Sequence, residues 1–102
     1  MADRFMTIRN PMYGHGTVTA YTGTAGTRAV LPAGCQSVWV MCTTAAYVRV
    51  GVDPTAVATD FPVAANVGYV LPLRADTPSE SQKVSAVQVA AGGNLHVIPL
   101  AE

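Results

Sequence analysis

The sequence predicts an all-β protein: a single β-sandwich or jelly roll of about seven to eight short antiparallel strands with an extended N-terminal arm. Three observations lead to this fold class. Val and Thr, which favour strands, are abundant. Gly or Pro recurs every several residues, as is typical of short strands joined by turns. No segment shows a sustained apolar stripe at helical spacing between capping residues.

Residues 1–16 are expected to form the arm, and residues 17–102 the sandwich domain. Asn10-Pro11 and Gly14-His15-Gly16 break regular structure within the arm. The arm nevertheless has large apolar side chains, which a disordered tail normally lacks. These residues are Phe5, Met6, Ile8, Met12 and Tyr13. We therefore expect them to be buried, either on this domain or on a neighbouring molecule, and they are the candidate docking residues.

The first four strands are expected over residues 17–22, 27–31, 35–43 and 46–50. The third of these has apolar side chains on both faces, because Val38 and Val40 alternate with Trp39 and Met41. It is therefore predicted to be central, with one face in the core and the other covered by the arm or by another subunit. Trp39 itself is interpreted as a core residue.

Thr44-Ala45 is interpreted as a hairpin connection between the third and fourth strands, although it lacks the usual Asn-Gly chemistry. Residues 51–66 are expected to be a long connection with room for one helical turn. A further strand is expected over residues 67–73, where Pro72 indicates an edge or a strand end. The polar stretch 74–81 is expected to be a solvent loop, and the last strands to cover residues 82–90 and 95–100.

The low charge of the chain predicts association. Only 12% of the residues are charged, with six basic and six acidic residues, whereas about 25% is typical. Few charges and no net charge remove the repulsion that keeps monomers apart. We therefore favour self-association or a partner protein over the alternative, a neutral monomer with a polar, uncharged surface.

The same composition argues against other partners. No basic run is present to neutralise nucleic-acid phosphates, so nucleic acid is not expected as a partner. No apolar stretch approaches the roughly 20 residues that span a bilayer, so no membrane partner is expected. The start of the chain lacks the basic and apolar regions of a signal peptide. These features predict synthesis in a cytoplasm.

No combination of residues in the sequence predicts catalysis. Cys35 and Cys42 lie among apolar residues and are expected to be buried, reduced thiols. Neither His15 nor His96 has a Cys, Asp or Glu at a metal-ligand spacing, and His96 is expected to be half-exposed on the last strand. We therefore expect no enzymatic activity, no catalytic residues, no metal and no cofactor.

Two tyrosines are candidates for surface contacts. Tyr47 and Tyr69 are better candidates for exposed rings than Trp39, and such rings suit contacts with either a sugar or a protein.

The order of several short segments resembles a known class of proteins. The segments are 31–40 (LPAGCQSVWV), 47–56 (YVRVGVDPTA), 61–67 (FPVAANV) and 83–97 (KVSAVQVAAGGNLHV). Over roughly residues 30–100 this order resembles small structural proteins of tailed-bacteriophage virions. The resemblance does not cover the N-terminal arm, and it implies no catalytic residues.

This resemblance implies a non-enzymatic virion protein of the capsid decoration or cement type. Such a protein would bind the major capsid protein on the capsid surface as a dimer or trimer, after assembly in the host cytoplasm. Two alternatives remain open: a carbohydrate-binding or adhesin module on the virion surface, and a head–tail or tail structural component.

Overall fold

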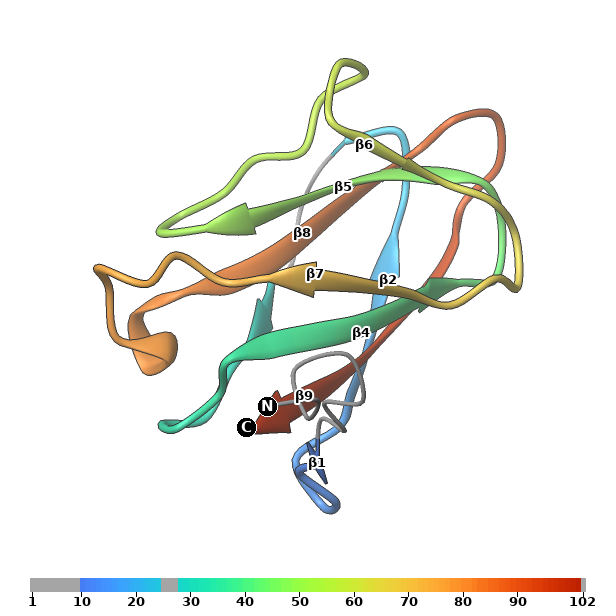
Figure 1. Ribbon diagram of the computed structural model, residues 1–102. Helices are drawn as coiled ribbons and strands as arrows, with labels where there is room; N and C mark the ends of the chain where they lie inside the picture. The colour runs from blue at the N-terminus through green and yellow to red at the C-terminus, as the bar shows by residue number, and fades with distance from the viewer. Residues whose placement is uncertain (1–9, 25–27, 102) are drawn as a thin grey trace, which may run out of the picture.

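The computed structural model describes residues 10–24 and 28–101. This part of the chain forms β-strands joined by loops, with one short 3₁₀ helix, η2 (Ser79–Ser81). The strands are β1 (Asn10–Pro11), β2 (Thr17–Tyr21), β3 (Ala29–Val30), β4 (Ser37–Cys42), β5 (Ala46–Gly51), β6 (Phe61–Val63), β7 (Tyr69–Pro72), β8 (Lys83–Gln88) and β9 (Gly93–Ala101). They form two stacked layers (Figure 1).

The strand order is that of a jelly roll. One sheet has the order β2-β9-β4-β7, and the other has the order β3-β8-β5-β6. Every pairing between these strands is antiparallel. Eight strands wound into two four-stranded sheets in this way define the jelly-roll architecture. The short β1 pairs with the end of β9, on the edge that β2 also occupies, and makes the first sheet five-stranded. The predicted all-β sandwich or jelly roll is confirmed, whereas residues 1–9 of the predicted N-terminal arm lie outside the described residues.

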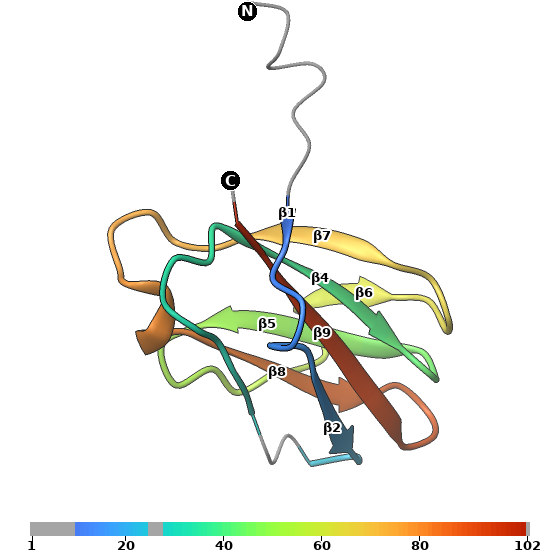
Figure 2. The same ribbon diagram turned by 90° about the horizontal axis from the view of Figure 1, so that it is seen from below.

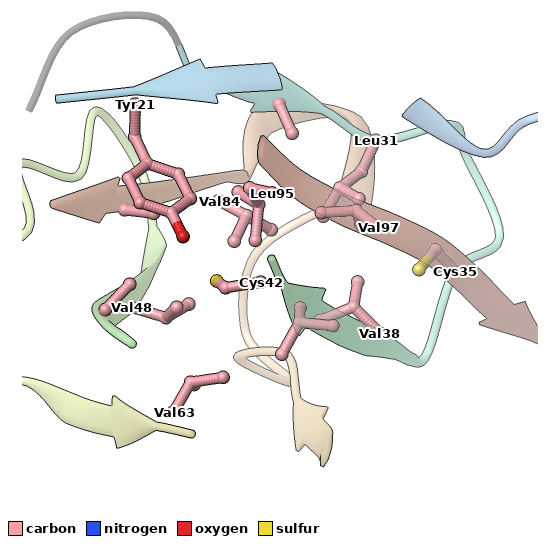
Figure 3. Packing of buried hydrophobic residues seen from close by; sticks show 14 residues of the cluster. Tyr21, Leu31, Cys35, Val38, Cys42, Val48, Val63, Val84, Leu95 and Val97 are labelled. Carbon is pink, nitrogen blue, oxygen red and sulfur yellow. The ribbon is translucent and has the colours of Figure 1, made fainter. Parts of the chain in front are cut away.

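The core lies between the two sheets, and valine is its commonest residue type. Val38, Val40 and Cys42 of β4 are fully buried, and Leu95 and Val97 of β9 lie beside them (Figure 3). Side chains of β5, β6 and β8 close the core from the four-stranded sheet, among them Val48, Val63 and Val84. Because strand residues alternate between faces, Trp39 and Met41 of β4 point away from this core. The interpretation of Trp39 as a core residue is therefore wrong.

Two local expectations are corrected by the topology. Thr44-Ala45 is not a hairpin connection, because β4 pairs with β9 and β7 whereas β5 pairs with β8 and β6. The chain crosses between the sheets at this point. The connection 51–66 contains a strand that was not expected, β6, which pairs with β5. In place of a helix, the segment 55–61 has a single hydrogen-bonded turn, in which the N–H of Asp60 donates to the carbonyl of Val57 at 3.0 Å. The prediction of an edge strand at Pro72 is confirmed, since β7 is the last strand of its sheet.

Loop residues cover the outer face of the four-stranded sheet. The backbone N–H of Ala56 donates to the buried Oγ of Ser85 at 3.0 Å, which holds the loop 52–60 against β8. Arg49 of β5 pairs with Asp60 at 2.9 Å, and the carboxylate of Asp60 also accepts from the N–H of Val57. The guanidinium of Arg28 donates to the carbonyl of Pro54 on the same loop. This sheet therefore has a polar, anchored covering on its outer side.

Candidate interaction surface

The outer face of the five-stranded sheet is free of charge. Its strands β1, β2, β4, β7 and β9 contain no Asp, Glu, Lys or Arg. The charged residues that the structure describes all lie on the other sheet or in loops: Arg28, Arg49, Asp53, Asp60, Arg74, Asp76, Glu80 and Lys83. The few charges of the chain are thus segregated, and one whole sheet lacks them. Charged residues are depleted at the centres of protein interfaces in the same way.

Strand register places apolar side chains side by side on this face. Opposite residues of an antiparallel pair share a face, so Ile98 of β9, Trp39 of β4 and Val70 of β7 form one row. A second row contains Val18 of β2 and Met41 of β4, with His96 between them. The exposed fractions of Val18 and Val70 are 62% and 53%. We call these two rows the apolar face.

A pocket of about 560 Å³ opens beside the first row. Its lining consists of Pro11, Met12, Tyr13, Gly14, Gly16, Trp39, Ile98 and Leu100, none of which is charged. One wall comes from β4 and β9, and the other comes from the segment that joins β1 to β2. The volume lies within the range of about 300–1,000 Å³ that is typical of small-ligand sites. Such sites also have a few convergent polar groups, and the side chains here provide only the Tyr13 hydroxyl and the Trp39 indole N–H.

The second wall exists because residues 12–16 loop out between two segments that pair with the same strand. Pro11 pairs with Leu100 and Thr17 with Val97, so five residues lie opposite only Ile98 and Pro99. The N–H of Met12 donates to the carbonyl of Pro99 at 2.8 Å, and the N–H of His15 donates to the carbonyl of Met12 at 3.1 Å. Gly14 takes a φ of 86° in this turn, a conformation that favours glycine. Figure 2 shows this blue segment lying beside β9.

The candidate docking residues of the arm divide into two groups. Phe5, Met6 and Ile8 lie outside the described residues. Met12 and Tyr13 line the pocket, where Met12 is half-buried and also packs against the core. The Tyr13 ring is 85% exposed at the turn. The structure therefore places Met12 and Tyr13 in the lining of the same pocket as Trp39, which no pattern in the sequence indicated.

The two candidate surface tyrosines do not form a common groove. Tyr47 lies on β5, opposite Val87, and therefore on the outer side of the four-stranded sheet. Tyr69 lies on β7, opposite the buried Val40, and faces inward at the edge of the other sheet. Its ring contacts Phe61 edge-on at a centroid distance of 5.4 Å, and its hydroxyl accepts from the N–H of Ala64 at 3.2 Å. Both rings are half-buried, and Tyr69 closes the open side of the sandwich.

The other polar candidates are also separate from one another. His96 is half-buried on the apolar face, and His15 is exposed in the loop beside the pocket. Within residues 10–24 and 28–101, no three His, Cys, Asp or Glu side chains gather where they could hold a metal ion. Cys35 and Cys42 are buried and unpaired with each other, as the sequence predicts. Burial raises the pKa of both thiols, and hydrogen bonds only partly offset this effect.

We predict that both thiols are inert in the folded protein. A thiol reagent at about pH 8 should label neither Cys35 nor Cys42 until the protein unfolds, because the reactive thiolate is scarce and shielded.

Because each folded pKa lies above its unfolded value, the stability that the thiols provide is present below the unfolded pKa. It is lost as the pH rises through the folded pKa. When the pH is raised from about 8 to 10, the free energy of unfolding of Cys42→Ala should therefore fall less than that of the unmodified protein. Rapid labelling of the native protein would contradict the prediction that the thiols are inert.

No helix among the described residues has the length and apolar character needed to cross a membrane. No family model matches the chain, and no curated protein or solved structure is significantly similar to it. The fold and the surface together define the class of protein: a charge-poor jelly-roll domain with one uncharged, apolar sheet face and a pocket at its edge.

Proposed function

We propose that this protein is a non-enzymatic virion structural protein that decorates and stabilises a phage capsid by binding the major capsid protein. Its site of action would be the outer surface of the virion, after assembly in the host cytoplasm. The resemblance of residues 30–100 to small tailed-phage virion proteins supports this proposal. Jelly rolls are used in viral capsids but also in lectins, so the fold alone does not decide between these functions.

The apolar face is the observation that carries the proposal. Val18, Met41 and Val70 lie on a sheet without any charge, and Tyr13 projects beside them. Apolar surface that leaves water contributes about 25 cal/mol per Å², and a standard interface buries about 800 Å² on each partner. A flat, uncharged sheet face suits the joint between two shell subunits. Many identical copies, each bound modestly, would then reinforce one shell through multivalency.

The carbohydrate-binding alternative gains no specific support from the geometry. Tyr47 and Tyr69 lie on different sheets, and the pocket that contains Tyr13 and Trp39 is lined almost wholly by apolar groups. Sugar sites need several convergent hydrogen-bonding groups in addition to aromatic rings. A head–tail or tail component could use the same apolar face, and imaging of the native particle would separate that role from capsid decoration.

The test compares two glutamate substitutions at valines of similar exposure. Val70→Glu places a charge on the apolar face, whereas Val30→Glu places one on β3 of the other sheet, where Val30 is 59% exposed. We expect Val70→Glu to weaken binding to cognate empty capsids about 100-fold, because an interfacial carboxylate would lose its hydration without gaining a partner. Co-sedimentation measures the affinity. Val30→Glu should bind like the unmodified protein.

Equal affinities of the two variants would contradict the proposal, as would a larger loss for Val30→Glu. Binding of the unmodified protein to a glycan array, without binding to capsids, would favour the adhesin alternative instead.

A further inference from the structure

We propose that the pocket beside Trp39 binds the N-terminal segment, residues 2–9, of a second copy of this chain. The copies would thereby exchange arms and form a closed oligomer of two or three subunits. This inference does not depend on the capsid proposal, because it concerns a contact between copies of the same chain.

The chemistry of the pocket defines what can occupy it. The lining side chains of Met12, Trp39, Ile98 and Leu100 are apolar, and no charged group is present to fix an ionic ligand. The pocket therefore suits a segment that inserts large apolar side chains. The exposed side chain of Tyr13 also lines the pocket and provides a further aromatic surface for such a segment.

The first nine residues provide a segment of this kind. They lie outside the described structure and contain Phe5, Met6 and Ile8. Asp3 and Arg4 precede these residues and Arg9 follows them, so the charged ends can remain in water while the apolar side chains insert. The segment joins the fold at Asn10, directly before the pocket residue Pro11. The apolar segment and the first residue of the pocket lining are thus separated by only one residue in the sequence.

The direction of the chain at Asn10 favours the pocket of another copy. Asn10 pairs with Ala101 and Pro11 with Leu100, so from Pro11 to Asn10 the backbone is directed towards the end of β9 and away from the pocket. The proline at position 11 restricts Asn10 to extended conformations, which keeps this direction. The sequence Met6-Thr7-Ile8-Arg9 contains none of the usual turn residues and therefore does not favour a return of the arm to its own pocket. Nine extended residues reach about 30 Å, enough to span to a neighbouring subunit.

Trp39 is the only tryptophan of the chain and lines the pocket, so its fluorescence reports occupancy directly. We expect the emission of the full chain to be blue-shifted relative to a variant that lacks residues 2–9, and to move towards the red on dilution as the copies separate. A peptide of residues 1–9 added to the shortened variant should restore the blue shift. Emission that stays blue at every dilution would show that the arm fills its own pocket and would overturn the proposal. Identical emission of the two proteins would overturn it as well.

A mixing experiment tests whether the arm acts on another copy. The shortened variant retains the pocket but lacks the arm, and Ile98→Glu retains the arm but has a charge in the pocket. Neither should associate alone, whereas their mixture should form a one-to-one complex, detected by native mass spectrometry. Each single variant should raise the dissociation constant of self-association at least about 100-fold, since up to three large apolar side chains lose their burial. Absence of the mixed complex, while the shortened variant still binds the peptide, would rule out exchange.

Val70→Glu serves as the control for the charged substitution. Val70 lies on the same sheet face as Ile98 but does not line the pocket. This variant should associate normally while it loses capsid binding. Failure of the capsid proposal and failure of the arm exchange can therefore be distinguished. Loss of self-association in Val70→Glu would show that the sheet face itself, not the arm, joins the copies.

Discussion

Gln82→Glu should destabilise this protein strongly, although the two side chains have nearly the same shape. We expect the free energy of unfolding to fall by about 3–5 kcal/mol at pH 7. The Gln82 side chain is fully buried. Its amide nitrogen donates to the carbonyls of Arg74 and Thr77 at 3.1 and 3.0 Å, and its amide oxygen accepts from the N–H of Arg74 at 3.1 Å. One side chain thus satisfies three backbone groups of the loop 74–81.

The substitution exchanges the two donated N–H groups for a carboxylate that faces two carbonyl oxygens. Burial and these carbonyls would raise the pKa of the new carboxyl above its unfolded value of about 4.3. The stability of the protonated form is then present below the unfolded pKa and is lost as the pH rises through the folded pKa. The deficit relative to the unmodified protein should therefore be smaller at pH 4 than at pH 7.

Thermal unfolding measures this effect, since a loss of this size lowers the melting temperature of a domain of about 100 residues by more than about 12 °C. Gln36→Glu is the matched control, because Gln36 is exposed and precedes β4. That control should stay within about 0.5 kcal/mol of the unmodified protein. A deficit for Gln82→Glu that is equal at both pH values would show that loss of shape, not charge, destabilises the loop.

The burial of the Gln82 side chain and its hydrogen bonds to the loop are features that the sequence could not predict. Alternation of apolar residues predicted most of the strands, because a half-buried strand has a period of two that is visible locally. Ser79, in contrast, lies in the polar stretch 74–81 that was expected to be a solvent loop, and Gln82 is a polar residue at the start of the strand expected over residues 82–90. Both are buried: Ser79 donates to the carbonyl of Pro32 at 2.6 Å and accepts from the N–H of Cys35 at 3.1 Å. Partners so distant in the sequence leave no local signal.

Strand pairing was harder to predict than strand position. The run 46–50 was identified as a strand, but proximity in sequence suggested a hairpin with β4, whereas it pairs with the distant β8. The strand β6 was missed because it has only three residues with Pro62 at its centre, a pattern that argues against a strand. In a jelly roll most neighbouring strands are distant in the sequence, so local patterns predict elements better than topology.

The interaction surface could be predicted only in part, because local patterns indicate which strand faces are apolar but not which strands are neighbours. Apolar residues on both faces of 35–43 predicted a covered outer face, and the structure places Trp39 and Met41 there. That all strands of one sheet lack charge becomes evident only once the strand order is known. The pocket is lined by residues from the segment 11–16 and by Trp39, and β9 brings them to the same place because it pairs with β1, β2 and β4.

Gly68→Ala should disturb this surface more than any other small substitution. A Cβ at Gly68 would lie 2.3 Å from Nε1 of Trp39 and 2.6 Å from two further indole atoms, closer than real contacts allow. The glycine cannot easily withdraw, because β7 begins at the next residue and the N–H of Asn66 donates to the carbonyl of Cys42 at 2.7 Å. The indole must therefore move away from β7.

Displacement of the indole would reduce its own burial and alter one wall of the pocket. We expect the free energy of unfolding to fall by about 1–3 kcal/mol, within the range for overpacked sites. The emission of Trp39 should shift towards the red, and association through the pocket should weaken at the same time. Gly51→Ala is the matched control, because a Cβ at Gly51 meets no atom within 4 Å. It should be neutral or slightly stabilising, since alanine restricts the unfolded chain.

The combination of these measurements separates packing from recognition. If Gly68→Ala lowered stability without changing the emission, the strain would be absorbed by the backbone between β6 and β7 instead of by Trp39. If the emission shifted but self-association was unaffected, Trp39 would be a passive part of the wall, and the arm would have to bind elsewhere. A change in both the emission of Trp39 and the self-association is expected if the shape of the pocket depends on the packing of the indole against Gly68.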